Sequence, residues 1–577
     1  MRIRKVKISN YRNIDGLTVE LSTSCSYIVG ENNLGKSNLL NLLNTIGAGK
    51  SFDEDDFKDP GKPIEIDLTI ELDQNEENVF DNQFCGDDTS LLTICYKQNI
   101  TDFIPAAVCQ GTGSDISLNQ LRKLNFFKYD SAASARKEIN SDTRKQLGML
   151  INGLAERFME QKSIAPLVNA RSMEEVAEFV NDRFSRIQGL SQYNIVTTVA
   201  ANTSDIVNRL LNLTDEEKRL QSTGSGMQYI AMASLGILCY IMGLYKSKSI
   251  PFESRLYTNS NGEKILPMIL AVDEPEVHLH PYLQRSLINF YKRILNNKDN
   301  DFRELLRECF DIDGILGQII IVTHSTDALV GDYRNLVRFF RENRTVSVIS
   351  GASENLNITE ANEKHLTMHF PELKEAFFSH CVVLIEGATE YGCIRRFAET
   401  LKIPLDDLGI CIIKADGEGN IEPLRQLLAV FRIPSIAIYD RDVKEKKGQS
   451  DRDFFTSEIF FEAEIVRKLY DSNQQQLARE IATELEGSAL HQIVDENWYN
   501  KYISKAGISG EGYVPKRLGE VSLEDEDEFC NVYSAWFTAK KGILLGRIVG
   551  EKFTADLIPD CYRDALLKAQ EVASNAG

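Results

Sequence analysis

Two adjacent carboxylates, Asp273 and Glu274, follow an apolar run in the middle of the chain. The run, Ile265 to Val272, has the length and composition of a fully buried parallel strand. In parallel α/β sheets the ligand crevice lies at the carboxyl ends of the strands. Because two carboxylates are costly to bury without a cation, we expect Mg²⁺ on a nucleotide near Asp273, with Glu274 polarising water. An ordinary strand that ends in a polar loop would have the same local sequence.

A glycine-containing loop near the start of the chain, Gly30 to Ser37, reads GENNLGKS and matches the pattern GxxxxGK[ST]. It follows a predicted strand, Ser26 to Val29, and precedes an apolar-periodic helix, Asn38 to Ile46. Backbone N–H groups of the loop and of the helix N-terminus would hold phosphates. Lys36 would reach the β- and γ-phosphates, and Ser37 would hold Mg²⁺. The alternative is a glycine turn with a surface lysine.

Four further carboxylates lie at predicted strand ends in the second half of the chain: Glu386, Glu390, Asp440 and Asp442. Glu390 is four residues after Glu386, in a predicted first helical turn, and can face the same side. Asp440 and Asp442 converge, because residues i and i+2 of an extended segment share a face. Four carboxylates at adjoining strand ends would repel one another unless divalent cations lay between them. Oxygen-only ligands predict Mg²⁺ or Mn²⁺ and not zinc, although each acid taken singly would more often be a solvated loop residue.

Strands and helices alternate around both groups of acids, which predicts an α/β protein with parallel sheets. At 577 residues the chain is too long for one core. We expect a first domain over residues 1–375, with a helical insertion or oligomerisation element at about 115–220. A second domain over 376–577 would carry a small parallel sheet, followed by a helical part from Phe460.

The composition is that of a soluble globular protein, with 43% hydrophobic and 26% charged residues. A net charge of −20 argues against a protein coated in basic surface, but it allows a local basic groove. The 11 cysteines form no CxxC pair and indicate buried thiols in a reducing cytosol. The first residues lack the apolar run of a signal peptide. Ser222 to Tyr245 is uncharged and nearly long enough to span a membrane, but we expect a buried core helix, and so a cytoplasmic protein without a membrane partner.

Three motifs together resemble the ABC-type ATPases of the SMC/RecF/Rad50 group: Gly30–Ser37, AVDEPEVHLHP around Asp273, and Thr323–His324–Ser325. The opening YRN and the ENN of the loop also match this group. The resemblance implies that Glu274 is the catalytic glutamate and that His324 contacts the γ-phosphate. GSGMQ, starting at Gly224, resembles the signature loop that a second subunit contributes, so the chain would be at least a dimer when ATP is engaged. The long coiled coil of SMC proteins is missing. The implied ATP-binding residues are Gly30, Asn33, Gly35, Lys36, Ser37, Ser225, Asp273 and His324.

The order EGxxE, from Glu386 to Glu390, and then DxD, from Asp440 to Asp442, resembles the Toprim domain of topoisomerases and primases. Toprim chemistry is phosphodiester cleavage or transfer with one or two metals. An ABC-type ATPase followed by a Toprim domain resembles the OLD (overcoming lysogenization defect) family of nucleases, including the Gabija A-type and retron-associated subunits. The resemblance implies an ATPase domain over 1–375 and a Toprim nuclease domain over 376–577.

In that family a further carboxylate follows the DxD motif, and a lysine lies near the C-terminus. Glu462 and Glu464, within FFEAE, are the candidates for this carboxylate. Lys541 is the first candidate for the lysine and Lys540 the second. Such a lysine would stabilise the charge that develops on the scissile phosphate, although a lysine on a helix is usually only solvated.

The predicted function is an ATP-regulated, divalent-metal-dependent DNA endonuclease, with a role in anti-phage defence implied by the resemblance. Its cofactors would be ATP and Mg²⁺ or Mn²⁺. Its partners would be DNA, further copies of itself in a dimer or tetramer, and a defence-system partner such as a UvrD-like helicase or a retron reverse transcriptase with its RNA–DNA. One alternative is an SMC/RecF-like ATP-dependent DNA clamp or sensor with a non-cleaving Toprim fold. Another is a topoisomerase, for which the sequence has no recognisable catalytic tyrosine on a DNA-binding domain.

Overall fold

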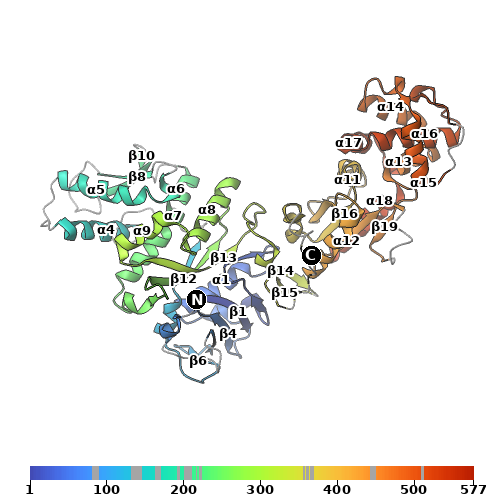
Figure 1. The fold of residues 1–577 in the computed structure, drawn as a ribbon. Helices are drawn as coiled ribbons and strands as arrows, with labels where there is room; N and C mark the ends of the chain where they lie inside the picture. The colour runs from blue at the N-terminus through green and yellow to red at the C-terminus, as the bar shows by residue number, and fades with distance from the viewer. Residues whose placement is uncertain are drawn as a thin grey trace. The chain divides into compact units, whose positions relative to one another are not determined.

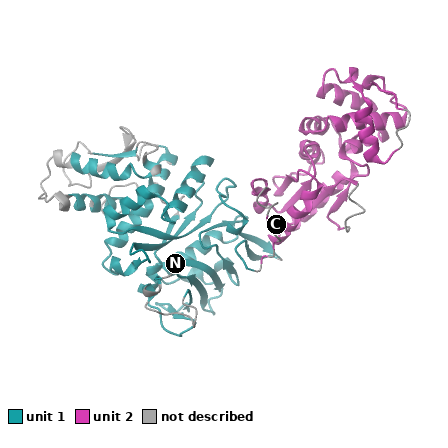
Figure 2. Cartoon of the chain, in the orientation of Figure 1, with its two compact units in different colours: residues 1–355 teal, residues 356–577 magenta. Residues whose placement is uncertain are grey.

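The chain forms two compact units, residues 1–355 and 356–577 (Figure 2). The computed structural model describes residues 1–73, 75–80, 90–130, 146–162, 170–191, 195–199, 211–215, 218–219, 224–277, 279–342, 344–354, 356, 358, 363, 369–441, 450–508 and 513–576. The functional domains expected from the sequence, 1–375 and 376–577, stay predictions beside these units.

The first unit is built on a parallel sheet with antiparallel strands added to it (Figure 1). The strand order is β11 (Tyr257–Thr258), β12 (Lys264–Asp273), β13 (Gly314–Val322), β3 (Cys25–Val29), β14 (Leu336–Glu342) and β15 (Thr345–Ser350), and β7 (Phe126–Asp130) also pairs with β12. Every residue of β12 after Lys264 is buried, as a parallel strand covered on both faces requires. Asp273 pairs with Val322, and Val322 pairs with Ile28. The strands β12, β13 and β3 therefore end side by side, at the carboxyl end of the parallel sheet.

Helix α1 (Lys36–Gly47) lies between the parallel sheet and a second, antiparallel sheet. That second sheet has the order β2 (Thr18–Glu20), β1 (Arg2–Ser9), β4 (Ile64–Glu71), β5 (Leu91–Gln98) and β6 (Ala106–Cys109). One hydrophobic core joins Leu39 of α1 to Ile66 and Ile269 of the two sheets. Burial on both sides fixes α1, and with it the loop that leads into the helix.

Helix α7 (Ser225–Tyr245) is a core element of the first unit. The ring of Tyr240 stacks on Phe127 of β7 with centroids 4.8 Å apart, and Ala233 O accepts a hydrogen bond from Tyr291 of α8 (Pro281–Ile294) at 2.9 Å. By length and hydropathy Gly226–Tyr245 could cross a membrane, but 78% of its most apolar window is buried inside the protein. The apolar run is accounted for by packing within the unit.

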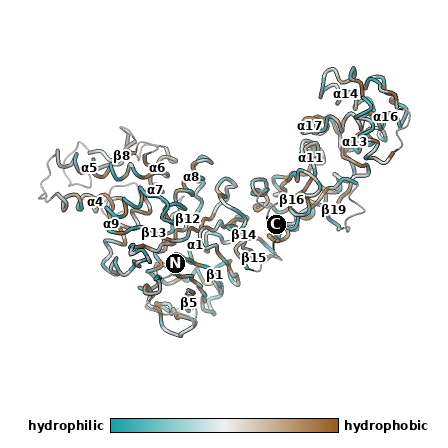
Figure 3. The backbone as a smooth tube through the Cα atoms, viewed as in Figure 1, coloured by the Kyte–Doolittle hydropathy of each residue, from teal (hydrophilic) through white to brown (hydrophobic). Residues whose placement is uncertain are grey.

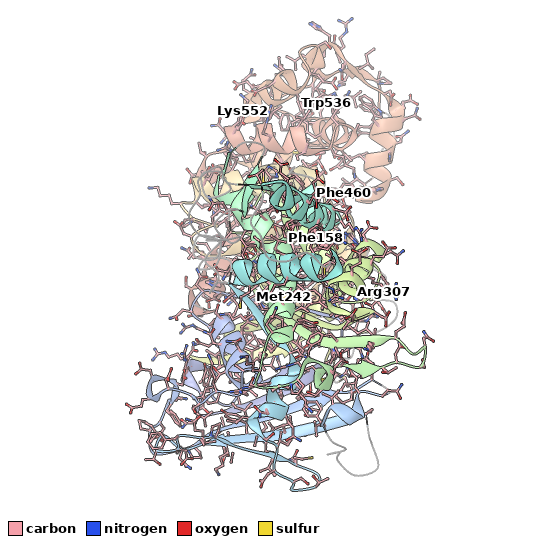
Figure 4. All side chains as sticks on the ribbon, turned by 90° about the vertical axis from the view of Figure 1, so that its left-hand side faces the viewer. Phe158, Met242, Arg307, Phe460, Trp536 and Lys552 are labelled. Atoms are coloured by element: carbon pink, nitrogen blue, oxygen red, sulfur yellow. The ribbon has the colours of Figure 1, made fainter. Side chains whose placement is uncertain are left out.

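The stretch 115–220, expected to be a helical insertion, is not helical throughout. It contains α2 (Leu118–Leu121), α4 (Gln146–Lys162), α5 (Ala170–Phe184) and α6 (Gln188–Ser191), but also β7 and a small antiparallel sheet of β8 (Ile195–Val199), β9 (Leu211–Asp215) and β10 (Lys218–Arg219). Phe158 of α4 packs against Phe179 of α5, with ring centroids 5.1 Å apart. Figure 4 labels Phe158 and, below it in that view, Met242 of α7. The run FFKYD is too short to be separated from helix by periodicity, and its pairing with β12 decides its structure.

The second unit has a four-stranded parallel sheet in the order β17 (Ile410–Lys414), β16 (Cys381–Ile385), β18 (Ser435–Tyr439) and β19 (Asp453–Phe455). Helices α11 (Ala388–Thr400) and α12 (Glu418–Val430) connect its strands. The apolar strands of both units appear as brown segments in Figure 3. The three strands predicted for this sheet are present, and β19 is an addition.

The rest of the second unit is helical, and it shares one core with the sheet. Its helices are α13 (Phe461–Asp471), α14 (Gln475–Leu485), α15 (Glu496–Ala506), α16 (Glu526–Ala539), α17 (Ile543–Lys552) and α18 (Asp560–Ala576), with a short pair of strands, β20 (Ile493–Val494) and β21 (Lys516–Arg517). Trp536 of α16 is fully buried, and Lys552 at the end of α17 pairs with Glu484 of α14 at 2.9 Å (Figure 4). These contacts hold α17 against the helical core.

Glycines bring α11 and α17 into direct backbone contact. A Cβ on Gly546 would lie 1.9 Å from Thr389 O, and a Cβ on Gly392 would lie 2.5 Å from Ile543 O. A Cβ on Gly550 would meet Cys393 Cα at 3.1 Å, so the contact advances along both helices in the same direction. The close approach fixes the N-terminal ends of α11 and α17 beside one another.

The substitution Gly546→Ala is expected to lower the free energy of unfolding of the second unit by at least about 3 kcal/mol, because a helix must move to admit the methyl group. Thermal unfolding followed by circular dichroism measures this loss. Gly487→Ala is the control, since its Cβ would meet nothing within 4 Å, and it is expected to change stability by less than about 0.5 kcal/mol. Equal melting temperatures of the two variants would contradict the close packing of α11 against α17.

Candidate active sites

The loop from Gly30 to Ser37 can be built only with glycine at two positions. Gly30 has φ +132°, and a Cβ there would lie 2.1 Å from Phe339 O of the neighbouring strand β14. Gly35 has φ +89°, and a Cβ there would lie 2.3 Å from Ile14 Cγ2. Helix α1 begins immediately afterwards at Lys36, so the loop ends at the N–H groups of a buried helix.

The Lys36 ammonium lies over this loop. It donates a hydrogen bond to Gly30 O at 2.8 Å and another to Glu31 O. Burial lowers the pKa of Lys36 to about 8, and the negative charges of Glu274 and Glu31 oppose that change. A desolvated cation held above a cradle of backbone N–H groups is suited to a phosphate, which would offset the cost of burying the charge.

Ser37 and Asp273, the two expected magnesium ligands of this site, are brought together. Ser37 Oγ donates to Asp273 Oδ1 at 3.1 Å. Lys128 of β7, which the sequence reasoning missed, has its Nζ 3.4 Å from Asp273 Oδ2 and donates to Asn41 Oδ1 at 2.7 Å. Only the pairing of β7 with β12 places Lys128 here, so the sequence carries no local signal for it.

Glu274 and His324 face each other at the same edge. Glu274 has φ +51°, and its N–H donates to Val322 O at 2.9 Å, which holds the residue at the end of β13. Its Oε1 lies 3.9 Å from His324 Nε2. Burial, with the Lys36 charge as the second cause, lowers the pKa of His324, which favours the neutral imidazole.

Glu276 positions His324 and was also missed. Its carboxylate accepts hydrogen bonds from Thr323 Oγ1 at 2.8 Å and from the His324 N–H at 2.6 Å. Burial raises the pKa of Glu276. These two hydrogen bonds connect the loop after β12 to the loop after β13. The stretch DEPE contains three acids, and only the parallel pairing of β12 with β13 shows which loop Glu276 holds.

The opening YRN motif is hydrogen-bonded to the loop Gly30–Ser37 and to the first turn of α1. Asn13 Nδ2 donates to Asn33 O at 3.1 Å, and Asn38 Nδ2 donates to Asn13 Oδ1 at 2.8 Å. Arg12 adds a hydrogen bond to Asn38 Oδ1 at 2.8 Å. Asn33 itself has φ +63°. Ser225 is the first residue of α7, directly after the N-capping residue Gly224, and its side chain lies outside the described atoms.

A second group of acids surrounds Thr389 at the end of β16. Glu386 follows that strand, and Glu390 lies buried in the first turn of α11. Thr389 Oγ1 donates to Glu462 Oε1 of α13 at 2.6 Å and accepts the Gly542 N–H at 3.1 Å. Thr389 therefore joins α11, α13 and the start of α17. It lies inside the EGxxE motif, but the motif alone gives no reason to single it out.

The carboxylates of this group are close enough to repel one another. The pKa of Glu390 is raised to about 8, first by burial and then by the charges of Glu462 and Glu386. Burial also raises the pKa of Glu462, and the positive charge of Lys541 opposes that rise. Glu386, Glu390, Glu462 and Lys541 thus act on one another electrostatically at one end of the sheet.

Asp440 follows β18 and reaches the same region. The phenol of Tyr562, fully buried on α18, has its pKa raised by burial and by the charges of Glu390 and Asp440 among others. Asp442 lies outside the described residues.

Glu464 is separated from Glu462, because residues two apart on a helix point about 200° apart. Its Oε2 accepts the Glu458 N–H at 2.7 Å, and burial raises its pKa.

The two candidate lysines have different surroundings. Lys540 Nζ pairs with Glu486 at 2.6 Å and lies over the rings of Trp498 and Trp536, at 5.4 and 5.9 Å from their centroids. Lys541 is exposed, and its charge acts on Glu462. The fold therefore brings Lys541 to the carboxylate group and holds Lys540 against Glu486 and the two tryptophans.

The donor set of the second site suits a hard divalent cation. Glu386, Glu390, Glu462 and Asp440 offer only carboxylate oxygens. The pKa of Glu390 is raised first by burial and then by neighbouring negative charge, and a cation would offset the cost of both. No three acidic, histidine or cysteine side chains among the described residues form a ready metal centre as they stand. Asp442, expected to be a ligand, is outside those residues.

Comparisons with known proteins agree with the two units. Residues 1–104 and 115–328, more than half of the chain, match the model of the AAA ATPase domain. Residues 377–442 match the overcoming lysogenization defect protein-like TOPRIM domain. The Old nuclease of Escherichia phage P2 is 23% identical over 499 residues, which cover 77% of each chain.

Among solved structures, the Smc head bound to the C-terminal winged-helix domain of ScpA aligns with a TM-score of 0.37 and 12% identity, over 60% of this chain and 98% of that one. The C-terminal region of the OLD protein of Xanthomonas campestris pv. campestris aligns with a TM-score of 0.24 and 20% identity, over 35% of this chain and 97% of that one. The matched models confirm the predicted pairing of domains: this chain belongs to the AAA ATPase domain family, and its second unit carries a TOPRIM domain of the OLD type.

Proposed function

We propose that the chain is an ATP-regulated, divalent-metal-dependent DNA endonuclease. The observation that carries the proposal is the buried carboxylate group around Thr389, where Glu390 has its pKa raised by burial and by Glu462 and Glu386, with Lys541 beside it. Buried acids that repel one another beside a lysine are arranged for a cation and a phosphate. The nuclease identity of the phage P2 relative supports the same assignment.

The carboxylates of this site would hold the metal ions, and Lys541 would contact the scissile phosphate. Glu386, Glu390, Asp440 and Asp442 would hold one or two Mg²⁺ or Mn²⁺ ions, with Glu462, of the two candidates Glu462 and Glu464, as the further ligand. When bound, such ions activate water and stabilise the leaving oxygen of a phosphodiester. Thr389 fixes the Glu462 carboxylate through its 2.6 Å hydrogen bond. Lys541 would donate to a non-bridging oxygen of the scissile phosphate and stabilise the charge that develops there.

The first unit would bind and hydrolyse ATP. Gly30, Asn33 and Gly35 shape the loop, Lys36 would contact the β- and γ-phosphates, and Ser37 and Asp273 would hold the magnesium of the nucleotide. Glu274 would accept the proton of the attacking water, and the neutral His324 would contact the γ-phosphate. Ser225 would complete the site of another copy, so the active form is a dimer or tetramer in which the ATP state governs DNA cleavage.

The proposed biological role is defence against phage in the cytoplasm. The role follows from the resemblance to the OLD family and from the DNA substrate that a nuclease of this type requires. A further defence-system partner, such as a UvrD-like helicase or a retron reverse transcriptase with its RNA–DNA, belongs to the same proposal.

The substitution Lys541→Ala is expected to slow DNA cleavage by about 100-fold, since it removes the cation beside Glu462. Lys540→Ala is the matched control. It removes the pair with Glu486 and the stacking over two tryptophans, so it is expected to lower stability by about 1 kcal/mol and to preserve cleavage. Plasmid-cleavage rates and thermal melting of both variants measure these effects. The reverse ranking of the two cleavage rates would contradict the proposed site.

The experiment that tests the function is incubation of the purified protein with supercoiled plasmid and Mg²⁺, Mn²⁺ or EDTA, with and without ATP. We expect nicked or linear DNA with either metal and none in EDTA. The ATP lanes give the sign of nucleotide control. An intact ATPase that leaves the plasmid uncut under every condition would favour the clamp-or-sensor alternative.

A further inference from the structure

An exposed apolar surface lies beside the carboxylate group of the second unit. The exposed fractions are 40% for Tyr391, 53% for Ile543 and 57% for Leu544. Together with Arg395 and Arg547 we call these residues the α11–α17 face. Among the described residues of the second unit, no aromatic ring contacts the ring of Tyr391.

The glycine contacts show that these residues share one side of the helix pair. A Cβ on Gly392 would lie 2.5 Å from Ile543 O and 2.9 Å from Arg547 N, which places the first turn of α17 against the residue that follows Tyr391. Arg395 is one turn after Tyr391, and Arg547 is one turn after Ile543. The opposite side of the pair, with Cys393 and Leu545, is buried in the core. The exposed residues of both helices therefore lie together on the side of the helix pair that faces away from the core.

This face begins at the proposed cleavage site. Tyr391 directly follows the buried Glu390, and Ile543 comes two residues after Lys541. The hydrogen bond from the Gly542 N–H to Thr389 Oγ1 holds those two chain segments together at 3.1 Å. A strand whose phosphate reaches Glu390 and Lys541 would therefore pass its next nucleotides along Tyr391 and Ile543.

The charge of the face suits a polyanion. Arg395 and Arg547 of the face are exposed, and so is the neighbouring Lys541. Arg395 pairs with the exposed Asp406 at 3.4 Å, and Arg547 pairs with Glu551 at 3.9 Å. Such exposed pairs are weak and exchange readily for other anions. The face therefore combines exposed cations with an apolar surface, although the chain as a whole carries a net charge of −20.

We propose that the α11–α17 face binds the bases of an unpaired DNA strand next to the scissile phosphate, with Tyr391 as the stacking platform. A paired duplex presents phosphates at its surface and keeps its bases stacked within, so it offers nothing apolar to Tyr391, Ile543 and Leu544. An unpaired strand offers both its phosphates and the faces of its bases, which aromatic side chains bind without sequence preference. The inference rests on the proposed nuclease function and names its substrate: DNA with unpaired nucleotides at the cut, such as a flap, bubble or single strand.

The test is binding of fluorescein-labelled DNA of about 20 nucleotides to the full-length protein in EDTA, followed by fluorescence anisotropy. The probes are a single strand, a blunt duplex and a duplex with a single-stranded flap. We expect wild type to bind the single strand and the flap about tenfold more tightly than the duplex. Tyr391→Ala should lose most of that preference and keep its affinity for duplex, whereas Tyr391→Phe should retain the preference, because the ring is preserved.

Leu567→Ser, which removes another exposed apolar side chain of this unit, is the matched control and should bind all probes like wild type. Equal affinity of wild type for all three probes, or an equal loss on all probes in Tyr391→Ala, would overturn the inference. So would loss of self-association in Ile543→Ser, measured by sedimentation, with unchanged single-strand affinity, because the face would then be a contact between copies. Because binding is measured without metal, a failure of cleavage with the Tyr391 effect intact would reject the nuclease function alone.

Discussion

The substitution Glu390→Gln is expected to abolish metal-dependent cleavage and, at the same time, to make the metal-free protein more stable. Glu390 is almost completely buried, and its pKa is raised to about 8 by burial, Glu462 and Glu386. The glutamine has the shape of the acid without its charge, so the cost of burying that charge disappears. The gain should be on the order of 1–3 kcal/mol at about pH 8. Cleavage should fall by about 100-fold or more, because a metal ligand is lost.

Two measurements separate these effects. Melting temperatures in EDTA and in Mg²⁺ should show a stabilised variant that gains little from metal, whereas wild type should be stabilised by metal binding. Plasmid cleavage gives the loss of activity. Glu399→Gln, on the same helix but exposed and paired with Arg396, is the control and should leave both readouts near wild type. A Glu390→Gln protein that is less stable than wild type in EDTA would show that the buried carboxylate is satisfied without a cation.

The second large effect is expected from Glu274→Gln, which should reduce ATP hydrolysis by about 10²–10⁴-fold and leave ATP binding intact. Glu274 is held at the sheet edge by its own N–H bond to Val322 O, and its carboxylate faces His324 at 3.9 Å. The amide keeps this position but cannot accept the proton of the attacking water. Binding of a fluorescent ATP analogue and release of phosphate measure the two steps separately.

The matched control for this effect is Glu253→Gln, an exposed acid of the same unit that pairs with Lys264. It should hydrolyse ATP at the wild-type rate. If Glu274→Gln retained hydrolysis within about threefold of wild type, Glu274 would not be the general base. If the variant lost nucleotide binding as well, its role would be in holding the loop.

The residues that could be predicted from the sequence are those whose role is set by a few neighbours along the chain. Ile265–Val272 is apolar without interruption, and it forms the buried part of β12. GENNLGKS carries its own conformational signal, because Gly30 and Gly35 adopt backbone angles that favour glycine. EGxxE likewise places Glu386 and Glu390 around one helix start.

Residues brought in by pairing or by helix packing could not be predicted in this way. Lys128 reaches Asp273 only because β7 pairs beside β12, and Glu276 reaches the His324 loop only because β12 and β13 are parallel neighbours. Thr389 could not be singled out from the sequence, because its role depends on hydrogen bonds of its hydroxyl that join α11 to α13 and to the start of α17.

The choice between Glu462 and Glu464 depends in the same way on the rotation of α13, which an isolated FFEAE motif does not define. In the structure Glu462 meets Thr389, and Glu464 meets the Glu458 N–H.

The second unit is proposed to cut DNA with its strand-end carboxylates. The most direct measurement compares wild type with Asp440→Ala on supercoiled plasmid in Mn²⁺, with the ATPase rate of both proteins measured in the same preparation. We expect nicked or linear DNA from wild type, uncut plasmid from Asp440→Ala, and equal ATP hydrolysis by both. Cutting by Asp440→Ala at the wild-type rate would contradict this proposal, because the phosphodiester chemistry would then have to come from elsewhere.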